Sequence, residues 1–306
     1  MNFLSVKKKL VNILNNYELY LLLLPTMIYF SIFHYLPMYG VQIAFKDYNI
    51  FKGVSGSEWI GFYHFERFMN SHQFWRILNN TITLSLYSMA VRFPIPIILA
   101  LLLNQLRNDK FKKIVQTITY APNFISIMVI VGMLFIFLSP SYGLFNQILV
   151  FFGIAPIFFM GKAEWFRHVF VWSDLWQSLG ISMIIYIAAL AGIDPSLHEA
   201  AAVDGASKLQ RIRHIDIPGI AATISILLIL NIGNVMTIGF EKAFLMQNPL
   251  NVSTSEVIAT YVYKVGLLDS KFSYSAAIGF FNSIINCTLL LSVNYIARRL
   301  GQESLW

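Results

Sequence analysis

The feature that most constrains the fold of this chain is a succession of long apolar runs. A helix needs roughly 20 apolar residues to cross a bilayer, and six segments come close to or exceed that length: about 19–37, 81–103, 118–138, 168–191, 219–240 and 275–296. Within lipid, only helices and closed barrels satisfy all backbone hydrogen bonds, and runs of this length favour helices. We therefore predict an all-α polytopic membrane protein, with six transmembrane helices in one membrane domain of residues 19–296.

The composition agrees with a surface that faces lipid. The chain is 57% hydrophobic and 12% charged, and a soluble domain carries roughly twice that charged fraction. The net charge of +7 is modest, and in a membrane protein it reports orientation rather than binding of nucleic acid. Because Cys287 is the one cysteine of the sequence, a disulfide within the chain and a metal site of several thiolates are both excluded.

The apolar stretch 145–160 leaves an alternative topology open. It contains Gly153 and Pro156 and is short for a span. We predict an interfacial or loop element here. A seventh span at this place would invert the C-terminal half of the protein.

The distribution of basic residues predicts the orientation. In a six-span topology with the N-terminus inside, the basic residues of the inner segments are Lys7, Lys8, Lys9, Arg107, Lys110, Lys112, Lys113, Lys208, Arg211, Arg213, Arg298 and Arg299. They crowd into short stretches beside helix ends, as the positive-inside rule requires. We predict a plasma-membrane protein with a cytoplasmic basic N-terminus (1–18), an uncleaved first helix and a cytoplasmic C-terminal tail (297–306).

The outer loops are rich in aromatic residues, notably 62–75 and 162–172. An interfacial aromatic belt is one interpretation. A docking surface for a soluble partner outside the cell is the other, and the same residues can serve both.

A small, charged segment, 194–218, separates the fourth and fifth apolar runs. Asp194 followed by Pro195 is a helix-start signal. Gly205 ends this helix or allows a close backbone approach, and Pro218 begins the next span. The pattern predicts two short helices joined by a turn on the cytoplasmic side, where Glu199 and Asp204 offer acceptors to a partner.

The spacing within this segment resembles the EAA motif of ABC importer permeases, EAA-x3-G-x9-I-x-L-P. Glu199, Ala200, Ala201, Gly205, Ile215 and Pro218 match, and Ile217 stands where leucine is usual. The first outer loop, "YLPMYGVQIAFKDYNIFKG", and the second and third apolar runs are similar to those of the carbohydrate-uptake family, especially its polysaccharide and oligosaccharide branch.

This resemblance implies a set of partners and roles. The family pairs each permease with a second, homologous permease as a heterodimer, with two cytoplasmic ATPase subunits and with an extracellular solute-binding protein that delivers a glycan. ATP and Mg would bind the partner ATPase, and no cofactor is expected on this chain. The residues implied in coupling to the ATPase are Glu199, Ala200, Ala201, Asp204, Gly205, Ile215 and Pro218.

The sequence also predicts that the chain is not an enzyme. The string "MGKA" at 160–163 lacks the first glycine and the final hydroxyl of a phosphate-binding loop. "HEAAA" at 198–202 lacks the second histidine of the zinc-protease motif.

Polar residues within the apolar runs are candidates for the substrate path, because such residues are costly in a membrane. The candidates are Arg92, Asp174, Trp176, Gln177, Asn231, Asn234 and Asn282, and Trp172 fits the same pattern. Arg92 and Asp174 could equally form an ion pair that holds the bundle together. Hydrogen bonds between helices are the alternative role of the amides.

The sequence leaves three other functions as alternatives. An ion-coupled secondary transporter would show internal repeats and several acids within the apolar runs. We find no convincing repeat, and Asp174 is the only acid well inside a run. An intramembrane enzyme would need a convergent acid–base pair. An ABC importer permease could also carry a solute other than a sugar.

Overall fold

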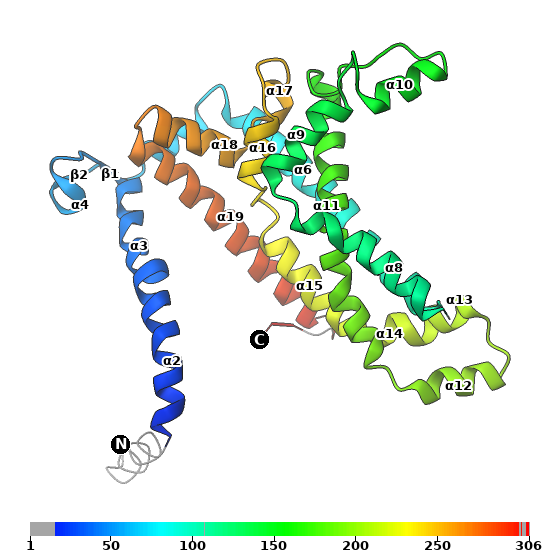
Figure 1. Cartoon of the computed structure of the whole chain (residues 1–306). Coiled ribbons are helices and arrows are strands. Elements are labelled where there is room, and N and C mark those ends of the chain that lie inside the picture. The colour runs from blue at the N-terminus through cyan, green and yellow to red at the C-terminus, as the bar shows by residue number, and fades with distance from the viewer. Residues whose placement is uncertain (1–15, 107, 300, 302–303, 306) are drawn as a thin grey trace, which may run out of the picture.

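The computed structural model describes residues 16–106, 108–299, 301 and 304–305. Helices dominate, as the all-α prediction requires (Figure 1). In the described part, the sheet is one antiparallel pair of two-residue strands, β1 (Lys46–Asp47) and β2 (Glu58–Trp59). Lys7, Lys8, Lys9 and Arg107, with most of segment 1–18 and part of the tail 297–306, lie outside the described residues.

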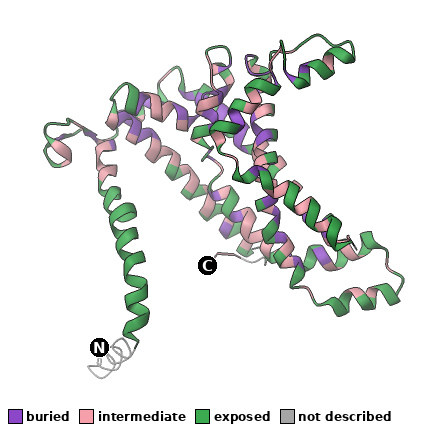
Figure 2. Ribbon diagram, viewed as in Figure 1, coloured by how far each residue is buried: buried purple, intermediate pink, exposed green. Residues whose placement is uncertain are grey.

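The first apolar run forms a helical stretch whose N-terminal part stands apart from the bundle (Figure 1), whereas its last part, Tyr39–Phe45, packs against α19 (Phe272–Arg299). It comprises α2 (Tyr17–Phe30), a π-helical turn (Ser31–Tyr35), α3 (Leu36–Met38) and a 3-10 helix (Tyr39–Phe45). No residue of α2 is buried, and Figure 2 shows the helix exposed along its length. This apolar surface therefore needs lipid or another protein to cover it.

Three further runs form long helices that cover the predicted spans. The second run comprises α6 (Phe74–Arg92) and α7 (Pro94–Asn104), which continue one another. The fourth and sixth runs are the uninterrupted helices α11 (Ala163–Ala191) and α19 (Phe272–Arg299). The centre of the bundle is α11, which packs against both α6 and α7.

The third run is bent, which corrects the prediction of one continuous span at 118–138. The chain forms α8 (Asp109–Tyr120) and a 3-10 turn (Ala121–Phe124), then turns by 101° into α9 (Ile127–Phe137). Pro122 has no backbone N–H to continue the α-helical hydrogen bonds. The chain leaves helical geometry at Ile125 and Ser126, whose backbone is extended. Ser126 then caps α9 by accepting a hydrogen bond from Val129 N.

The fifth run is also bent and ends earlier than predicted. The helical elements α13 (Lys208–Arg211), a π-helical turn (Ile212–Asp216) and α14 (Ile217–Gly219) lead through a 62° bend into α15 (Ala221–Gly233). Residues 234–239 are not helical, so the predicted span 219–240 is too long at its C-terminal end. Within residues 16–106 and 108–299, length and composition give four spanning helices, or up to six if each bent pair counts as one span. The six-span topology therefore stays a prediction.

The remaining elements are short and connect the long helices. They are α4 (Gly53–Gly56), α5 (Tyr63–Met69), α10 (Leu144–Phe151), α12 (Pro195–Val203), α16 (Phe240–Met246), α17 (Val252–Ser255), α18 (Ile258–Tyr263) and a π-helical turn (Lys264–Leu268). The stretch 145–160 contains the eight-residue α10 and no long helix. Buried Asn146 holds its loop closed through Leu138 O, Ser139 O and both polar groups of the Ile157 backbone.

Three buried clusters hold these elements together. One joins α6 and α11 around Leu84 and Phe170, and a second joins α7, α11 and Ile220. The third packs Phe68 and Ile278 between α5 and α19. Since α11 contributes to two of the clusters, its position fixes both ends of the bundle.

Candidate functional site

The first helix of the segment 194–218 begins where the sequence predicts. Asp194 Oδ1 accepts a hydrogen bond from Ser196 N at 2.9 Å, and Pro195 occupies the first turn of α12. The hydrogen bond from the Ser196 backbone, supported by the Ser196 hydroxyl, lowers the pKa of Asp194. The cap therefore keeps its negative charge at neutral pH, where it also complements the helix dipole.

Gly205 ends α12 in the left-handed conformation. Its φ is +76°, which costs glycine little and other residues roughly 1–2 kcal/mol. Ala206 N donates to Ala201 O at 2.9 Å and Gly205 N donates to Ala202 O at 3.2 Å, the pair of bonds of a Schellman motif. A Cβ at Gly205 would meet no atom of the described residues within 4 Å, so the space around it is open in this part of the structure.

The second helix of the segment starts immediately after this turn. Ser207 N donates to Gln210 Oε1 at 2.7 Å, and Gln210 N donates to Ser207 Oγ at 3.4 Å. This reciprocal pair is a capping box. Both ends of the turn are thus fixed by residues within a few positions of it.

The helix α12 lies at the periphery of the molecule (Figure 1) and has no buried residue. Glu199, Ala200, Asp204 and Gly205 are all exposed. Val203, beside them, is 88% exposed. The predicted coupling residues of α12 therefore lie on a projecting surface that a partner can reach.

The segment is tied to the bundle by Asp216, which the sequence analysis did not single out. Asp216 is fully buried. Gln105 Nε2, after the end of α7, donates to it at 2.9 Å, and Asn104 Nδ2 donates at 3.5 Å. His198 Nε2, on α12, lies 3.2 Å from the same carboxylate. Asp216 therefore joins the projecting helix to the second long helix of the bundle, whereas Pro218 is exposed and Ile215 is only half-buried.

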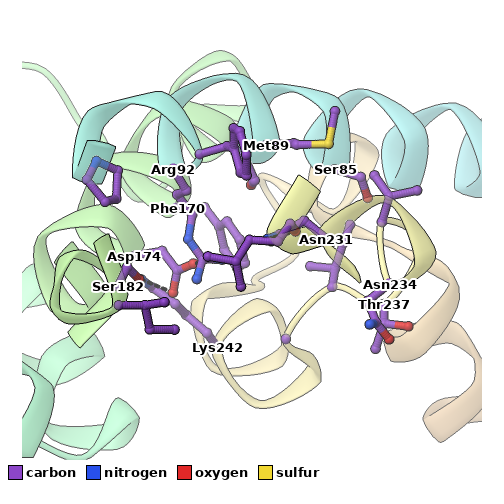
Figure 3. Close-up of a pocket in the computed structure, with 18 of the residues that line it drawn as sticks. Ser85, Met89, Arg92, Phe170, Asp174, Ser182, Asn231, Asn234, Thr237 and Lys242 are labelled. Atoms are coloured by element: carbon purple, nitrogen blue, oxygen red, sulfur yellow. Dashed lines mark hydrogen bonds and ion pairs between the residues drawn. The ribbon is translucent and has the colours of Figure 1, made fainter. Parts of the chain in front are cut away.

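A second polar region is a cavity of about 460 Å³ inside the bundle. It is lined by residues of α6, α11, α15 and α16, and Figure 3 shows the side chains that line it. Four of the predicted substrate-path residues line it: Arg92, Asp174, Asn231 and Asn234. The volume is in the range of ligand-binding pockets.

Three charged groups meet at one side of this cavity (Figure 3). Arg92 Nη1 lies 2.5 Å from Asp174 Oδ2, so the ion pair that the sequence left open is present in the structure. Lys242 Nζ lies 3.4 Å from the other carboxylate oxygen and 5.4 Å from the centre of the Phe170 ring. Burial lowers the pKa of Lys242 to about 8, against the opposing effect of Asp174.

Sequence reasoning missed Lys242, which it placed in an outer loop. The side chain is only 2% exposed, because α16 packs against α11. The available signal was an isolated lysine in "GFEKAFLM", a stretch that is otherwise mostly apolar. The sequence gives no indication of which acid this lysine faces.

Three other predicted substrate-path residues do not line the cavity. Gln177 Nε2 donates to Ile125 O at 3.0 Å, which satisfies the carbonyl at the bend of the third run. Trp176 is 47% exposed. Asn282 has a buried Oδ1 without a hydrogen-bond partner among the described residues.

These features define the class of protein: a helical membrane subunit with a polar cavity inside and a capped helix that projects from the bundle. The comparison with known families agrees. Residues 93–302 match the family described as "binding-protein-dependent transport system inner membrane component", and the chain belongs to this family. The predicted family is confirmed, and the chain is the permease subunit of an ABC transporter, not an enzyme or an ion-coupled carrier.

Individual relatives are similar over nearly the whole chain. The permease protein YteP of a polygalacturonan/rhamnogalacturonan transport system in Bacillus subtilis (strain 168) is 42% identical over 98% of this chain and 94% of its own length. Protein LplB of the same organism is 42% identical over 94% of this chain and 91% of its own length.

A solved structure shows the same fold. It is a bacterial ABC transporter involved in the import of the acidic polysaccharide alginate. One of its chains is 39% identical to this protein, with a TM-score of 0.89 over 96% of this chain and all of that chain. A related structure of the alginate transporter contains the periplasmic protein with a bound alginate pentasaccharide.

Proposed function

We propose that this protein is the permease subunit of an ABC importer that carries an oligosaccharide or a related glycan across the plasma membrane. The observation that carries the proposal is α12, a helix that is capped at both ends, has no buried residue and is anchored by the contact of His198 with Asp216. Such a helix can enter a cleft of a partner subunit and transmit its movement to the bundle. Glu199, Ala200, Ala201, Asp204 and Gly205 supply the surface that the ATPase contacts.

The cavity supports a glycan as the solute. Sugars are bound by hydroxyl, amide and charged side chains together with apolar surface. Asn231, Asn234 and Ser182 are among the polar residues of the cavity, and Phe170 and Ile238 among the apolar ones. Several relatives are named for polygalacturonan, rhamnogalacturonan or arabinooligosaccharides, which are glycans.

The proposal includes partners that complete the importer. A second, homologous permease would close the other side of the path and cover apolar surface such as that of α2. Two ATPase subunits, which bind ATP and Mg, would lie on the cytoplasmic side beneath α12, where both termini of this chain also lie. An extracellular binding protein would deliver the glycan to the opposite side.

Co-purification followed by transport tests this proposal. The tagged protein is purified gently from native membranes, its companions are identified by mass spectrometry, and the complex is reconstituted in liposomes with its binding protein. We expect ATP-dependent uptake of an oligosaccharide. A crosslink between position 199 and an ATPase would support the role of α12, with position 151 on exposed α10 as a control site. Purification of the chain alone, with no ATPase crosslinked to the 198–218 segment, would contradict the proposal.

A further inference from the structure

The charges that line the central cavity do not balance. Arg92 and Lys242 are cationic, and Asp174 is the acid that faces both of them. Among the described lining residues the remaining titratable side chain is Tyr186, which is neutral at pH 7. The described wall therefore carries an excess of one positive charge. An uncompensated charge is most costly at Lys242, whose side chain is 2% exposed.

The cavity also presents hydroxyl groups that lack partners. Ser85 Oγ and Ser88 Oγ, both on α6, are buried without a hydrogen-bond partner among the described residues. Both line the cavity. Buried polar groups are rarely left unpaired, so these two hydroxyls point to a polar molecule in the cavity.

Figure 3 places the charged residues on one side of the cavity and Asn234 and Thr237 on the other. The amide nitrogens of Asn231 and Asn234 donate to Leu227 O and Leu230 O of their own helix. Their amide oxygens remain able to accept hydrogen bonds from a sugar hydroxyl. The wall thus combines a cationic side with a side that accepts hydrogen bonds.

From these observations we infer that the cavity binds a saccharide unit that carries a carboxylate, with Lys242 as the residue that selects for its charge. The inference rests on the proposed glycan transport and makes it more specific. The sugar carboxylate supplies the missing negative charge beside Lys242 and Arg92. Asp174 keeps the two cations in place when the cavity is empty and competes with the ligand for them.

The experiment uses the complete permease–ATPase complex and two matched probes. One probe is tetragalacturonate, and the other is the same tetrasaccharide with its carboxyl groups reduced to alcohols. Equilibrium binding is measured on the complex without the binding protein, so that selection by the binding protein does not contribute. The variants are Lys242→Met, Lys242→Arg and the control Lys271→Met, which removes an exposed lysine that pairs with Asp269.

We expect wild type to bind tetragalacturonate more tightly than the reduced probe. Lys242→Met should weaken binding of tetragalacturonate by about ten-fold or more, as expected for a lost charge-assisted hydrogen bond. Binding of the reduced probe should change by less than about two-fold. Lys242→Arg should keep the preference, and Lys271→Met should behave as wild type.

Equal binding of the two probes by wild type would overturn the inference, and would indicate that the second permease supplies the missing acid. An equal loss of both probes in Lys242→Met would overturn it as well, because the lysine would then be structural. If Lys242→Met does not insert, the salt dependence of the wild type still tests the inference. Added salt should weaken binding of tetragalacturonate and leave binding of the reduced probe unchanged, and an equal effect on both probes would overturn it. Failure of the proposed glycan transport would give a different result. The reconstituted wild type would then take up no saccharide that its binding protein delivers.

Discussion

The coupling segment and the central cavity are held together by contacts of different range. In the segment, Asp194, Gly205 and Ser207 fix the ends of the two helices through hydrogen bonds that span five residues or fewer. In the cavity, Arg92, Asp174 and Lys242 come from three different helices. The helix ends of the coupling segment are determined by a short stretch of sequence. The charged group in the cavity forms only when the bundle is packed.

The two regions also differ in how they meet their surroundings. The helix α12 has no buried residue, so its shape does not depend on packing in its own chain. Lys242 is almost fully buried, so its charge depends on what lies beside it. Substitutions on the exposed surface of α12 should therefore impair transport while sparing the fold, whereas substitutions that break the Arg92–Asp174 pair should affect both.

The largest effect is expected for Gly205→Leu. The left-handed backbone makes the change cost about 1–2 kcal/mol, and the open space around Gly205 means that no clash arises within the chain. We expect normal insertion and loss of at least about 90% of uptake, because the new side chain blocks the surface that meets the ATPase. Uptake per amount of membrane-inserted protein is the measurement.

The sequence offers a matched control for this substitution. Gly153 also has a φ of +76° and an equally open environment, but it follows α10, far from α12 in the chain. Gly153→Leu should cost the same backbone strain and leave uptake near the wild-type level. Equal uptake by Gly205→Leu and Gly153→Leu would contradict the role of the surface around Gly205 in contacting the ATPase.

The second effect in size is expected for Asp216→Ala. It leaves the side-chain donors of Gln105 and Asn104 without their acceptor. A buried group left unsatisfied costs about 1–3 kcal/mol, and the cost should lie toward the lower end here because both residues are half-buried. It also frees α12 from the bundle. We expect a lower thermal unfolding midpoint, together with ATP hydrolysis that is no longer matched by uptake.

The control here is Asp269→Ala, which removes an exposed acid paired with Lys271. Exposed pairs contribute about 0–1 kcal/mol, so this variant should match wild type in both measurements. If Asp216→Ala keeps the wild-type ratio of uptake to ATP hydrolysis, Asp216 does not anchor the coupling helix.

How far the sequence predicts each region follows from the range of its contacts. The start of α12 at Asp194 and its end at Gly205 could be predicted, because caps are local. The bend at Ile125 and Ser126 had a local signal as well, the proline at position 122, but it lies within a long apolar run that favours one continuous helix. Lys242 could not be assigned to the cavity, because the sequence does not show that it meets an acid 68 positions earlier. Asp216 could not be recognised for the same reason, since two of its three partners, Asn104 and Gln105, lie more than 100 positions earlier in the chain.

The third effect is expected for Arg92→Glu, which places a second acid beside Asp174. A buried ion pair that loses one partner costs about 3–5 kcal/mol, and the cost should be smaller here because the Arg92 side chain is 41% exposed. We expect reduced yield and uptake for this variant. The double variant Arg92→Glu with Asp174→Arg should recover part of both, as measured by thermal unfolding and uptake. Absence of any recovery would mean that the pair does not hold the two helices together.

The smallest effect is expected for Gln177→Met, which separates a structural from a binding role. Gln177 donates to Ile125 O at the bend of the third run, and an internal hydrogen bond contributes about 0.5–1.5 kcal/mol. We expect a small decrease in the unfolding midpoint, with the KM for the glycan unchanged, because the side chain does not line the cavity. Trp176→Phe, at the adjacent and half-exposed position, should change neither quantity. A raised KM with an unchanged unfolding midpoint would instead place Gln177 in contact with the sugar, and would extend the substrate path beyond the cavity toward the bend between α8 and α9.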